Sequence, residues 1–445
     1  MKISALILLL ILTAFTFAED LTPSKDAIKL DIDTAVAKAF ENNLSLKNSQ
    51  IDMNNKILTL ATTWNQFIPN TSMSASLGRK DTTSTITTTT HNGATESSRE
   101  TETTNSLSAG FNTSLSLNAK MIFDVYQSGL DYKSGKITVK QAKKELEHNV
   151  KKTYYNLVLL NEQLFLTEKQ IEYAKSNYDT TLLKLEMGMV SEIDRLKSEY
   201  SYKSQLPEYS STKNDYEIGL LNFAQMIGLT ANVNIELISP IPEVSKIDYD
   251  EIPKSTLENN LEIQLLKENL KSDKNSLNTY ISSLTPSFGL SYSLSSSFSK
   301  DFTEDNWFDD TNDWNNSGNF NFSISIPIDS YFPFSSVQTN IIKSTNNILK
   351  SKNELQNQIK QTQISVITDT LKLKQLEESL EVLKLNIDIA EKAYNLVEQS
   401  YNAGSKGYLD LQDASNNLFD AKLKLLNTKY DYLTTYLDLK YLLNF

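Results

Sequence analysis

Hydrophobic residues along this chain follow two different spacings, and each spacing occurs in both halves of the sequence. Where apolar residues recur every three or four positions, the pattern predicts helices over residues 30–67, 121–187, 192–227, 335–403 and 407–443. The helix over 121–187 would be ~100 Å long, far longer than a compact domain needs. Pro207 predicts a kink within 192–227. The regular apolar steps from Leu376 to Tyr401 indicate a coiled-coil-like assembly.

Other segments alternate strictly between apolar residues and serine, asparagine or glycine, which predicts β-strands. Two hairpins are expected, over residues 70–119 and 286–329. The threonine-rich segment Asp81–Asn105 would join the first pair of strands, and the aspartate-rich segment Lys300–Gly318 the second, both as solvated loops. Calcium binding by Lys300–Gly318 is the alternative, but the spacing of its carboxylates fits no EF-hand loop.

The two halves of the sequence share landmarks at a nearly constant offset of 216 or 217 positions. The matched residues are Glu41–Leu44 with Glu258–Leu261, Pro69 with Pro286, Tyr178 with Tyr394, Gly188 with Gly404, and Asp194 with Asp410. A constant offset indicates a duplicated unit, so we expect a first repeat over 19–229 and a second over 254–445. The proline-containing segment 230–253 would link the repeats, or alternatively pack as a belt around the helices.

Four strands of this composition suit a bilayer better than water. The clearer strands run about ten residues, which is the length a tilted strand needs to cross a membrane, although a soluble sheet can show the same alternation. Four strands cannot close a barrel alone, and open edges are not tolerated in lipid. Oligomerisation is therefore expected, with eight strands from two copies or twelve from three, and twelve strands leave room for a channel.

Composition and charge limit the cellular location and the partners expected for the protein. Residues 1–18 contain one lysine, an apolar run and small residues before Glu19, which predicts a cleavable export signal, with an uncleaved anchor as the alternative. The net charge of −12 with interspersed basic residues argues against nucleic acid as a partner and favours cations. There is no cysteine, so an exported chain of this kind is held together by packing alone.

Enzymatic chemistry has little support in the sequence. The chain lacks cysteine and a phosphate-binding glycine loop, and its two histidines, His91 and His148, have no suitable neighbours in sequence. We therefore expect no catalytic residue, no cofactor and no metal site. A purely structural periplasmic coiled-coil protein is the alternative function, but it would not explain four serine-alternating strands.

The most informative motif is Tyr401–Ala414, which reads Tyr-Asn-Ala-Gly-Ser-Lys-Gly-Tyr-Leu-Asp-Leu-Gln-Asp-Ala. With this motif, the Ala-Phe-Glu-Asn-Asn-Leu start of the first helix and the Ile-Pro-Asn entry into the strands, the sequence resembles the TolC family of outer-membrane efflux proteins. The resemblance implies an α+β membrane protein: a homotrimer whose twelve-stranded barrel in outer-membrane lipid continues as a helical barrel into the periplasm. It also implies an exit duct for small molecules or proteins, with a periplasmic adaptor and an inner-membrane transporter as partners.

The same resemblance implies roles for residues of the two turns. Asp410 and Asp413 would form rings at the closed periplasmic tip, and Asp194, Tyr401 and Lys406 would form a latch. Gly188, Gly404 and Gly407 would form the turns themselves. The alternative is that the aspartates simply cap the helices that follow, where negative charge is favourable, and the two roles are compatible.

Overall fold

The computed structural model describes residues 28–89, 93, 95–230, 234–243, 254–301 and 314–444. The predicted export signal, His91 and most of Lys300–Gly318 lie outside these residues. The chain forms two compact units. A helical unit comprises the described parts of Met1–Ile51, Ile137–Gln264 and Asn357–Phe445, and a sheet unit comprises those of Asp52–Lys136 and Leu265–Gln356. Each unit draws on both halves of the sequence, and the division into two repeats stays a prediction.

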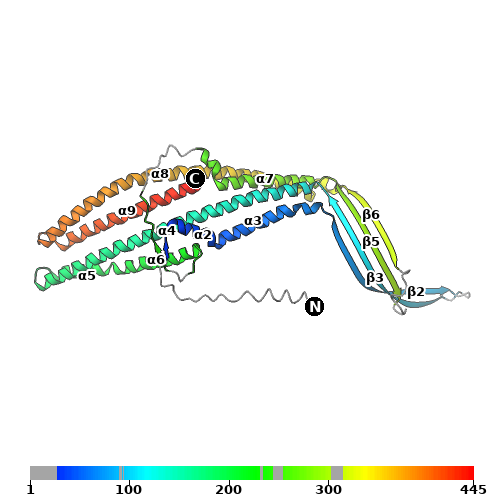
Figure 1. Ribbon diagram of the computed structural model, residues 1–445, viewed down its shortest axis with the longest axis horizontal. Coiled ribbons are helices and arrows are strands. Elements are labelled where there is room, and N and C mark those ends of the chain that lie inside the picture. Colours follow the sequence, from blue (N-terminus) through cyan, green and yellow to red (C-terminus); the bar gives the residue numbers. More distant parts are fainter. Residues whose placement is uncertain are drawn as a thin grey trace. The chain divides into compact units, whose positions relative to one another are not determined.

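Two long helices dominate the chain (Figure 1). They are α4 (Lys120–Glu186) and α8 (Ser336–Asn402), each 67 residues long and close to the bounds that the apolar spacing predicts. The shorter helices are α2 (Ile32–Asn42), α3 (Leu44–Thr62), α5 (Glu192–Lys203), α6 (Leu206–Met226), α7 (Leu261–Ser282) and α9 (Tyr408–Leu443). None of the helices in the described part of the chain is both long enough and apolar enough to span a bilayer.

Two of the predicted helices are divided in the structure. The helix expected over 30–67 ends at Asn42, restarts at Leu44 and finishes as the 3-10 turn Thr63–Phe67. The helix expected over 192–227 is interrupted between α5 and α6, where Ser204 and Gln205 keep right-handed helical dihedrals, so the chain is disrupted next to Pro207, as predicted. Pro207 lies in the first turn of α6, where its missing N–H leaves no bond unmade.

Two asparagines define equivalent helix junctions in the helical unit. The Asn43 side chain accepts a bond from Leu46 N at 3.0 Å and donates to Met226 O at 2.9 Å. The Asn260 side chain likewise accepts from Ile263 N at 3.0 Å and donates to Leu442 O at 2.9 Å. Each asparagine therefore caps the start of one helix and bonds a carbonyl at the end of another, α6 or α9.

The core of the helical unit surrounds Tyr154, which is fully buried. Its hydroxyl donates to Leu30 O at 2.9 Å and accepts from Ser239 N at 2.8 Å. Strands β1 (Ile28–Leu30) and β4 (Ile235–Leu237) pair in parallel beside it. The described part of 230–253 thus packs against the helices, as the belt alternative predicts. These three-residue strands are too short to leave a sequence pattern.

The sheet unit contains one antiparallel sheet in the order β2-β3-β5-β6 (Figure 1). Its strands are β2 (Asn70–Thr89), β3 (Thr95–Leu117), β5 (Ser287–Asp301) and β6 (Asn315–Ser325). The expectation of a solvated loop over Asp81–Asn105 is wrong, because the pairing of β2 with β3 continues to Thr89 and Thr95. Threonine is β-branched and favours extended backbone, so a polar threonine run extends the ribbon.

The register separates the sheet into two chemically distinct faces. Directly opposed residues share a face, and the row Met73, Phe111 and Leu294 ends at Gly318 of β6. This apolar face contains Met73, Ala75, Leu77, Leu107, Ala109, Phe111, Leu115, Phe288, Leu290, Tyr292, Leu294, Phe320, Phe322 and Ile324. The opposite face carries serine, asparagine and glycine, and Ser76 bonds Ser108 on it at 2.6 Å.

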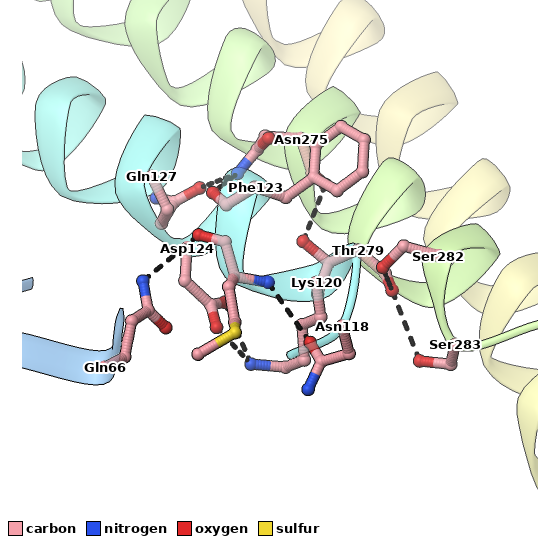
Figure 2. A network of polar contacts seen from close by, with 11 residues as sticks. Gln66, Asn118, Lys120, Phe123, Asp124, Gln127, Asn275, Thr279, Ser282 and Ser283 are labelled. Atoms are coloured by element: carbon pink, nitrogen blue, oxygen red, sulfur yellow. Dashed lines mark hydrogen bonds and ion pairs between the residues drawn. The ribbon is translucent and has the colours of Figure 1, made fainter. Parts of the chain in front are cut away.

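A polar network ties the helices of the sheet unit to the ends of its strands (Figure 2). The buried Asn275 of α7 donates to Phe123 O at 2.9 Å and to Gln127 Oε1 at 3.0 Å, both on α4. Gln66 donates to Met121 O at 3.1 Å from the segment that precedes β2. These bonds fix the points where the chain passes from helix to strand and back.

Candidate functional site

The first turn of the helical unit connects α4 to α5. Gly188 takes a positive φ of 72°, which a side chain would disfavour, and its N–H donates to Leu185 O at 2.8 Å. Ser191 and Asp194 then form a capping box at the start of α5, in which Ser191 N donates to Asp194 Oδ2 at 3.2 Å. Asp194 is therefore a helix cap.

The second turn connects α8 to α9 and repeats the backbone bonds of the first turn, without the side-chain bonds of Ser191. Gly404 has a φ of 77° and its N–H donates to Tyr401 O at 3.0 Å. Gly407 stands where Ser191 stands in the first turn, and its N–H donates to Asp410 Oδ2 at 3.2 Å. Gly407 is thus the N-cap residue of α9, and Asp410 in the first turn of the helix accepts its N–H.

The charged groups of the second turn lie at the surface. Lys406 Nζ lies 3.5 Å from Asp410 Oδ1, and the two side chains are 51% and 48% exposed. Asp413 is exposed one turn further along α9. Such an exposed i,i+4 pair contributes only ~0.3–0.5 kcal/mol, so Lys406 does not cancel the negative field of the two aspartates.

Tyr401 is buried, in contrast to the charged residues around it. It forms a small core with Tyr408 and Leu411, and the two tyrosine rings meet edge to face at 6.4 Å. Burial raises the pKa of Tyr408, although a hydrogen bond with Ser201 opposes this effect. The second turn is therefore anchored by aromatic packing.

Two residues at the end of α4 reach across to Tyr401. Thr181 is fully buried, with its Oγ1 3.4 Å from the Tyr401 hydroxyl. Lys184 Nζ lies 3.9 Å from the centre of the Tyr401 ring, which is a cation–π distance. Sequence reasoning did not assign either residue a role at the site, although Thr181 is a polar residue within the apolar spacing of its helix.

The structure brings together only part of the residue set proposed for a latch. Among the described residues, the recorded ion pair of Lys406 is with Asp410, Asp194 bonds Ser191, and Tyr401 contacts Thr181 and Lys184. No contact between Asp194 and Lys406 is recorded within this part of the chain.

The basic residue that follows Asp194 is already committed to other acids. Arg195 Nη2 lies 2.6 Å from Glu192 and its Nη1 lies 2.7 Å from Glu199, which also pairs with Lys203. The hydrogen bond from Arg195 lowers the pKa of Glu192, and those from Lys203 and Arg195 lower the pKa of Glu199. Arg195 is therefore paired with Glu192 and Glu199 within α5.

Metal and cofactor chemistry finds no support at the turns. In the regions covered by the structure, no group of three or more histidine, cysteine, aspartate or glutamate side chains is arranged to hold a metal ion. What the turns do carry is a set of exposed carboxylates, which attracts cations.

Comparison with known proteins finds one family match in the sequence. Residues 252–444 match the family described as outer membrane efflux protein. No curated protein sequence matches the chain.

Solved structures of outer membrane channels share the fold. The CmeC outer membrane channel of Campylobacter jejuni superposes with a TM-score of 0.79 at 19% identity, over 93% of this chain and 85% of that one. The MtrE outer membrane channel of Neisseria gonorrhoeae gives 0.70 at 17%, over 93% and 88%. The outer membrane protein VceC of Vibrio cholerae gives 0.71 at 13%, over 93% and 95%. At these identities the likeness establishes the fold. Residues 252–444 thus match the outer membrane efflux protein family, and the described chain shares the fold of solved outer membrane channels.

Proposed function

We propose that three copies of this chain form an exit duct, with a twelve-stranded barrel in the outer membrane and a helical tunnel in the periplasm. The duct would export small molecules or proteins delivered by an inner-membrane transporter, without a catalytic step of its own. Its periplasmic end would be gated at the two turns of each chain.

The observation that carries the proposal is the two-faced sheet with open edges. Met73, Leu77 and Phe320 on the apolar face are 85%, 75% and 66% exposed in the single chain, which only lipid would make favourable over such an area. The face spans Phe288–Leu294 and its neighbours, and ~10 residues tilted by about 45° match the ~25 Å apolar band of a membrane barrel.

The unpaired edges of the sheet favour a closed ring of three copies. Strands β2 and β6 are the outer strands of the sheet, so each offers an unpaired row of backbone groups. Because β2 and β6 run in opposite directions, β6 of one copy can pair antiparallel with β2 of the next. Three copies would close a ring of twelve strands whose serine-, asparagine- and glycine-rich face lines the bore.

Asp410 and Asp413 are proposed as the gate. Three copies would bring up to six carboxylates to the tip, where charges ~6 Å apart repel by about 0.7 kcal/mol in a water-like dielectric. Such a ring attracts cations and is blocked by multivalent ones. Capping of α9 by Asp410 is compatible with this role, because only one of its oxygens bonds Gly407 N.

Of the proposed latch residues, Asp194 and Lys406 are proposed to pair between neighbouring copies, while Tyr401 packs within its own chain. Lys406 pairs weakly with Asp410 and is half-exposed, so it is available to the Asp194 of an adjacent copy. An exposed pair of this kind contributes ~0.3–1 kcal/mol, so three pairs form a latch that a docking partner can open.

A periplasmic adaptor and an inner-membrane transporter are the proposed partners. The tips of both turns expose large apolar side chains: Met187, Met189, Ile193 and Leu409 are 62%, 70%, 63% and 56% exposed. Exposed apolar groups beside acidic ones are typical of a surface on which another protein docks.

Planar bilayer recording tests the proposal. The purified chain should have the native mass of a trimer and form cation-selective channels, and cross-linking in cells should capture an adaptor and a transporter. A monomer without conductance would contradict it. The alternative, a structural periplasmic coiled-coil protein, predicts a soluble periplasmic chain, but it would leave the apolar face of the sheet in water.

A further inference from the structure

Strands β2 and β3 continue past the rest of the sheet as a two-stranded ribbon (Figure 1). β3 pairs with β5 as far as Asp301, whereas β2 and β3 stay paired as far as Thr89 and Thr95. We call residues 81–89 and 95–103 the ribbon. It lies at the strand ends that are not joined to helices, so in the proposed duct it projects from the barrel on the side away from the periplasmic helices.

The apolar face of the sheet gives way to a basic residue where the ribbon begins. Leu77 opposes Leu107 in the last apolar row of β2 and β3, and the next row on the same face pairs Arg79 with Asn105. Side chains two positions apart on a strand share a face, so this face continues along the ribbon from Arg79. Arg79 therefore lies where the lipid-facing band ends and the lipid headgroups would begin.

Arg99 lies on the same face of the ribbon as Arg79. It directly opposes Thr85, which is an even number of positions from Arg79 on β2. The chain contains three arginines, Arg79, Arg99 and Arg195, and two of them thus share this one face. In a chain with a net charge of −12, this placement indicates an anionic partner beside the ribbon.

The opposite face of the ribbon carries negative charge. Glu100 opposes Ser84 and Glu102 opposes Thr82, on the face that continues the serine-rich side of the sheet. Both glutamates are exposed. The ribbon therefore presents its arginine on the lipid side and these carboxylates on the bore side, so that anions are attracted to one face and repelled by the other.

Asp81 is an acidic residue on the same face as the two arginines. Arg79 Nε donates to Asp81 Oδ1 at 3.2 Å, and Thr103 Oγ1 donates to the same oxygen at 2.8 Å. The Arg79 and Asp81 side chains are 60% and 54% exposed, and an ion pair so exposed to solvent is weak. A phosphate group can therefore compete with Asp81 for Arg79, since the guanidinium fork matches two phosphate oxygens.

We propose that the outer ribbon face, made of Arg79, Thr83, Thr85, Arg99 and Thr101, binds the phosphate groups of anionic lipid headgroups around the outer end of the barrel. The hydroxyls of Thr83 and Thr101 lie 3.1 Å apart, in a row between the two arginines, and can donate to phosphate oxygens. Lipid is the occupant because this face directly continues the apolar face of the sheet. The proposal rests on the proposed function, which places that apolar face in lipid.

Lipid retention by the purified trimer tests the proposal. The protein is reconstituted in vesicles of phosphatidylcholine mixed with phosphatidic acid and extracted in detergent, and its bound lipids are measured by native mass spectrometry. The wild-type protein should retain phosphatidic acid in preference to phosphatidylcholine. Arg79→Gln should reduce this preference about fivefold, and Arg79→Gln with Arg99→Gln about 25-fold, as expected for basic groups at an anionic membrane surface.

Lys80→Gln is the matched control for Arg79→Gln. Lys80 adjoins Arg79 on β2 and carries the same charge, but it opposes Thr104 on the other face of the strands, so its replacement should leave the preference for phosphatidic acid unchanged. Equal losses in the two variants would overturn the proposal, because they would show an effect of net charge alone. Displacement of the lipid by free inorganic phosphate would also overturn it, because the occupant would then be a soluble anion.

Fluorescent labels on the ribbon provide a second measurement that leaves the arginines in place. The chain has no native cysteine, so Thr85→Cys and Ser84→Cys each give one labelling site, and the two sites lie on opposite faces of β2. Lipid that carries a nitroxide on its headgroup should quench the label of Thr85→Cys more strongly than that of Ser84→Cys. Equal quenching would contradict the proposed orientation of the ribbon.

Failure of this proposal can be distinguished from failure of the proposed function. A wild-type chain that neither forms a trimer nor conducts in bilayers would contradict the proposed function. A conducting trimer that shows no preference for phosphatidic acid would overturn the headgroup proposal alone.

Discussion

At the scale of single residues, one side chain can serve both the fold and the proposed gate. Asp410 accepts a bond from Gly407 N and also lies 3.5 Å from Lys406. A helix cap needs an acceptor oxygen, whereas a cation ring needs charge. Asparagine keeps the acceptor and removes the charge, so the two roles can be separated by mutation.

Replacement of both gate aspartates by asparagine should remove trivalent-cation block while leaving stability nearly unchanged. Asp410→Ala with Asp413→Ala should also remove block, but it should cost ~0.5–2 kcal/mol because the cap of α9 is lost. Bilayer recording measures block, and thermal unfolding by circular dichroism measures stability. Block that persists in the asparagine variant would show that these residues are caps alone.

Replacement of the junction asparagines, Asn43 and Asn260, should lower the stability of the protein. Each caps one helix and bonds the end of another, so Asn43→Ala with Asn260→Ala should cost about 2–4 kcal/mol in total. For a chain of this length the melting temperature should fall by about 2–4 °C. Asn259→Ala is the matched control, because its side chain is exposed. Equal effects of the control and of the double variant would refute the junction role.

At the scale of elements, α4 and α9 are also joined by one charged cluster. His148 Nε2 and Lys152 Nζ each lie 2.9 Å from Asp438 Oδ1. Burial acts to raise the pKa of Asp438, but the hydrogen bonds from His148 and Lys152 outweigh it and hold the pKa below its ordinary value. Burial, with the nearby charge of Asp438, raises the pKa of Asp369.

The stability lost when this charged cluster is removed should depend on pH in a definite direction. A carboxylate with a depressed pKa in the folded state stabilises the protein above its unfolded pKa, and this contribution disappears as the pH falls through the folded value. Asp438→Asn should therefore lower the free energy of unfolding by ~1 kcal/mol at pH 7, because solvent screens a partly exposed ion pair. The loss should become progressively smaller below about pH 4. Asp420→Asn, an exposed position on the same helix, should show no such trend in melting temperature against pH.

The sequence predicts elements well where a pattern is long and poorly where tertiary contacts decide. The 67-residue helices carry many turns of apolar spacing, so their bounds are close to those observed. The pairing of Ile28–Leu30 with Ile235–Leu237 depends on Tyr154 and Ser239, which are far apart in sequence. The polarity of the threonine run predicts a loop, but the β-propensity of threonine favours the paired ribbon that the structure shows.

The candidate site is likewise predictable from the sequence only where a local pattern marks it. Glycine and aspartate spacing is enough to predict two turns, because φ > 0 and helix capping each restrict the residue type. The contacts of Tyr401 with Thr181 and Lys184 join positions more than 200 residues apart, and no local pattern marks such a pair. The sequence alone therefore does not predict that Lys184 is the cation over the Tyr401 ring, which the structure shows.

At the scale of the whole molecule, the proposed barrel assigns opposite environments to adjacent residues. Leu290 lies on the apolar face of β5 and is paired with Leu115 and Phe322, whereas Ser291 lies on the opposite face, between Ser114 and Asn321. In a closed twelve-stranded barrel the first would face lipid and the second the bore. A charged substitution at Leu290 therefore tests whether that face contacts lipid, and one at Ser291 tests whether the opposite face lines the bore.

Leu290→Lys should impair membrane insertion, whereas Ser291→Lys should not. A lysine facing lipid near the bilayer centre costs about 2–4 kcal/mol, which corresponds to a roughly 30- to 700-fold fall in the equilibrium constant for folding into liposomes. Ser291→Lys should assemble normally and place three positive charges in the bore, lowering cation selectivity in bilayer recordings. If both lysines were tolerated equally, with conductance unchanged, the sheet would not form the membrane wall of a channel, and the four strands would need a different partner for their apolar face.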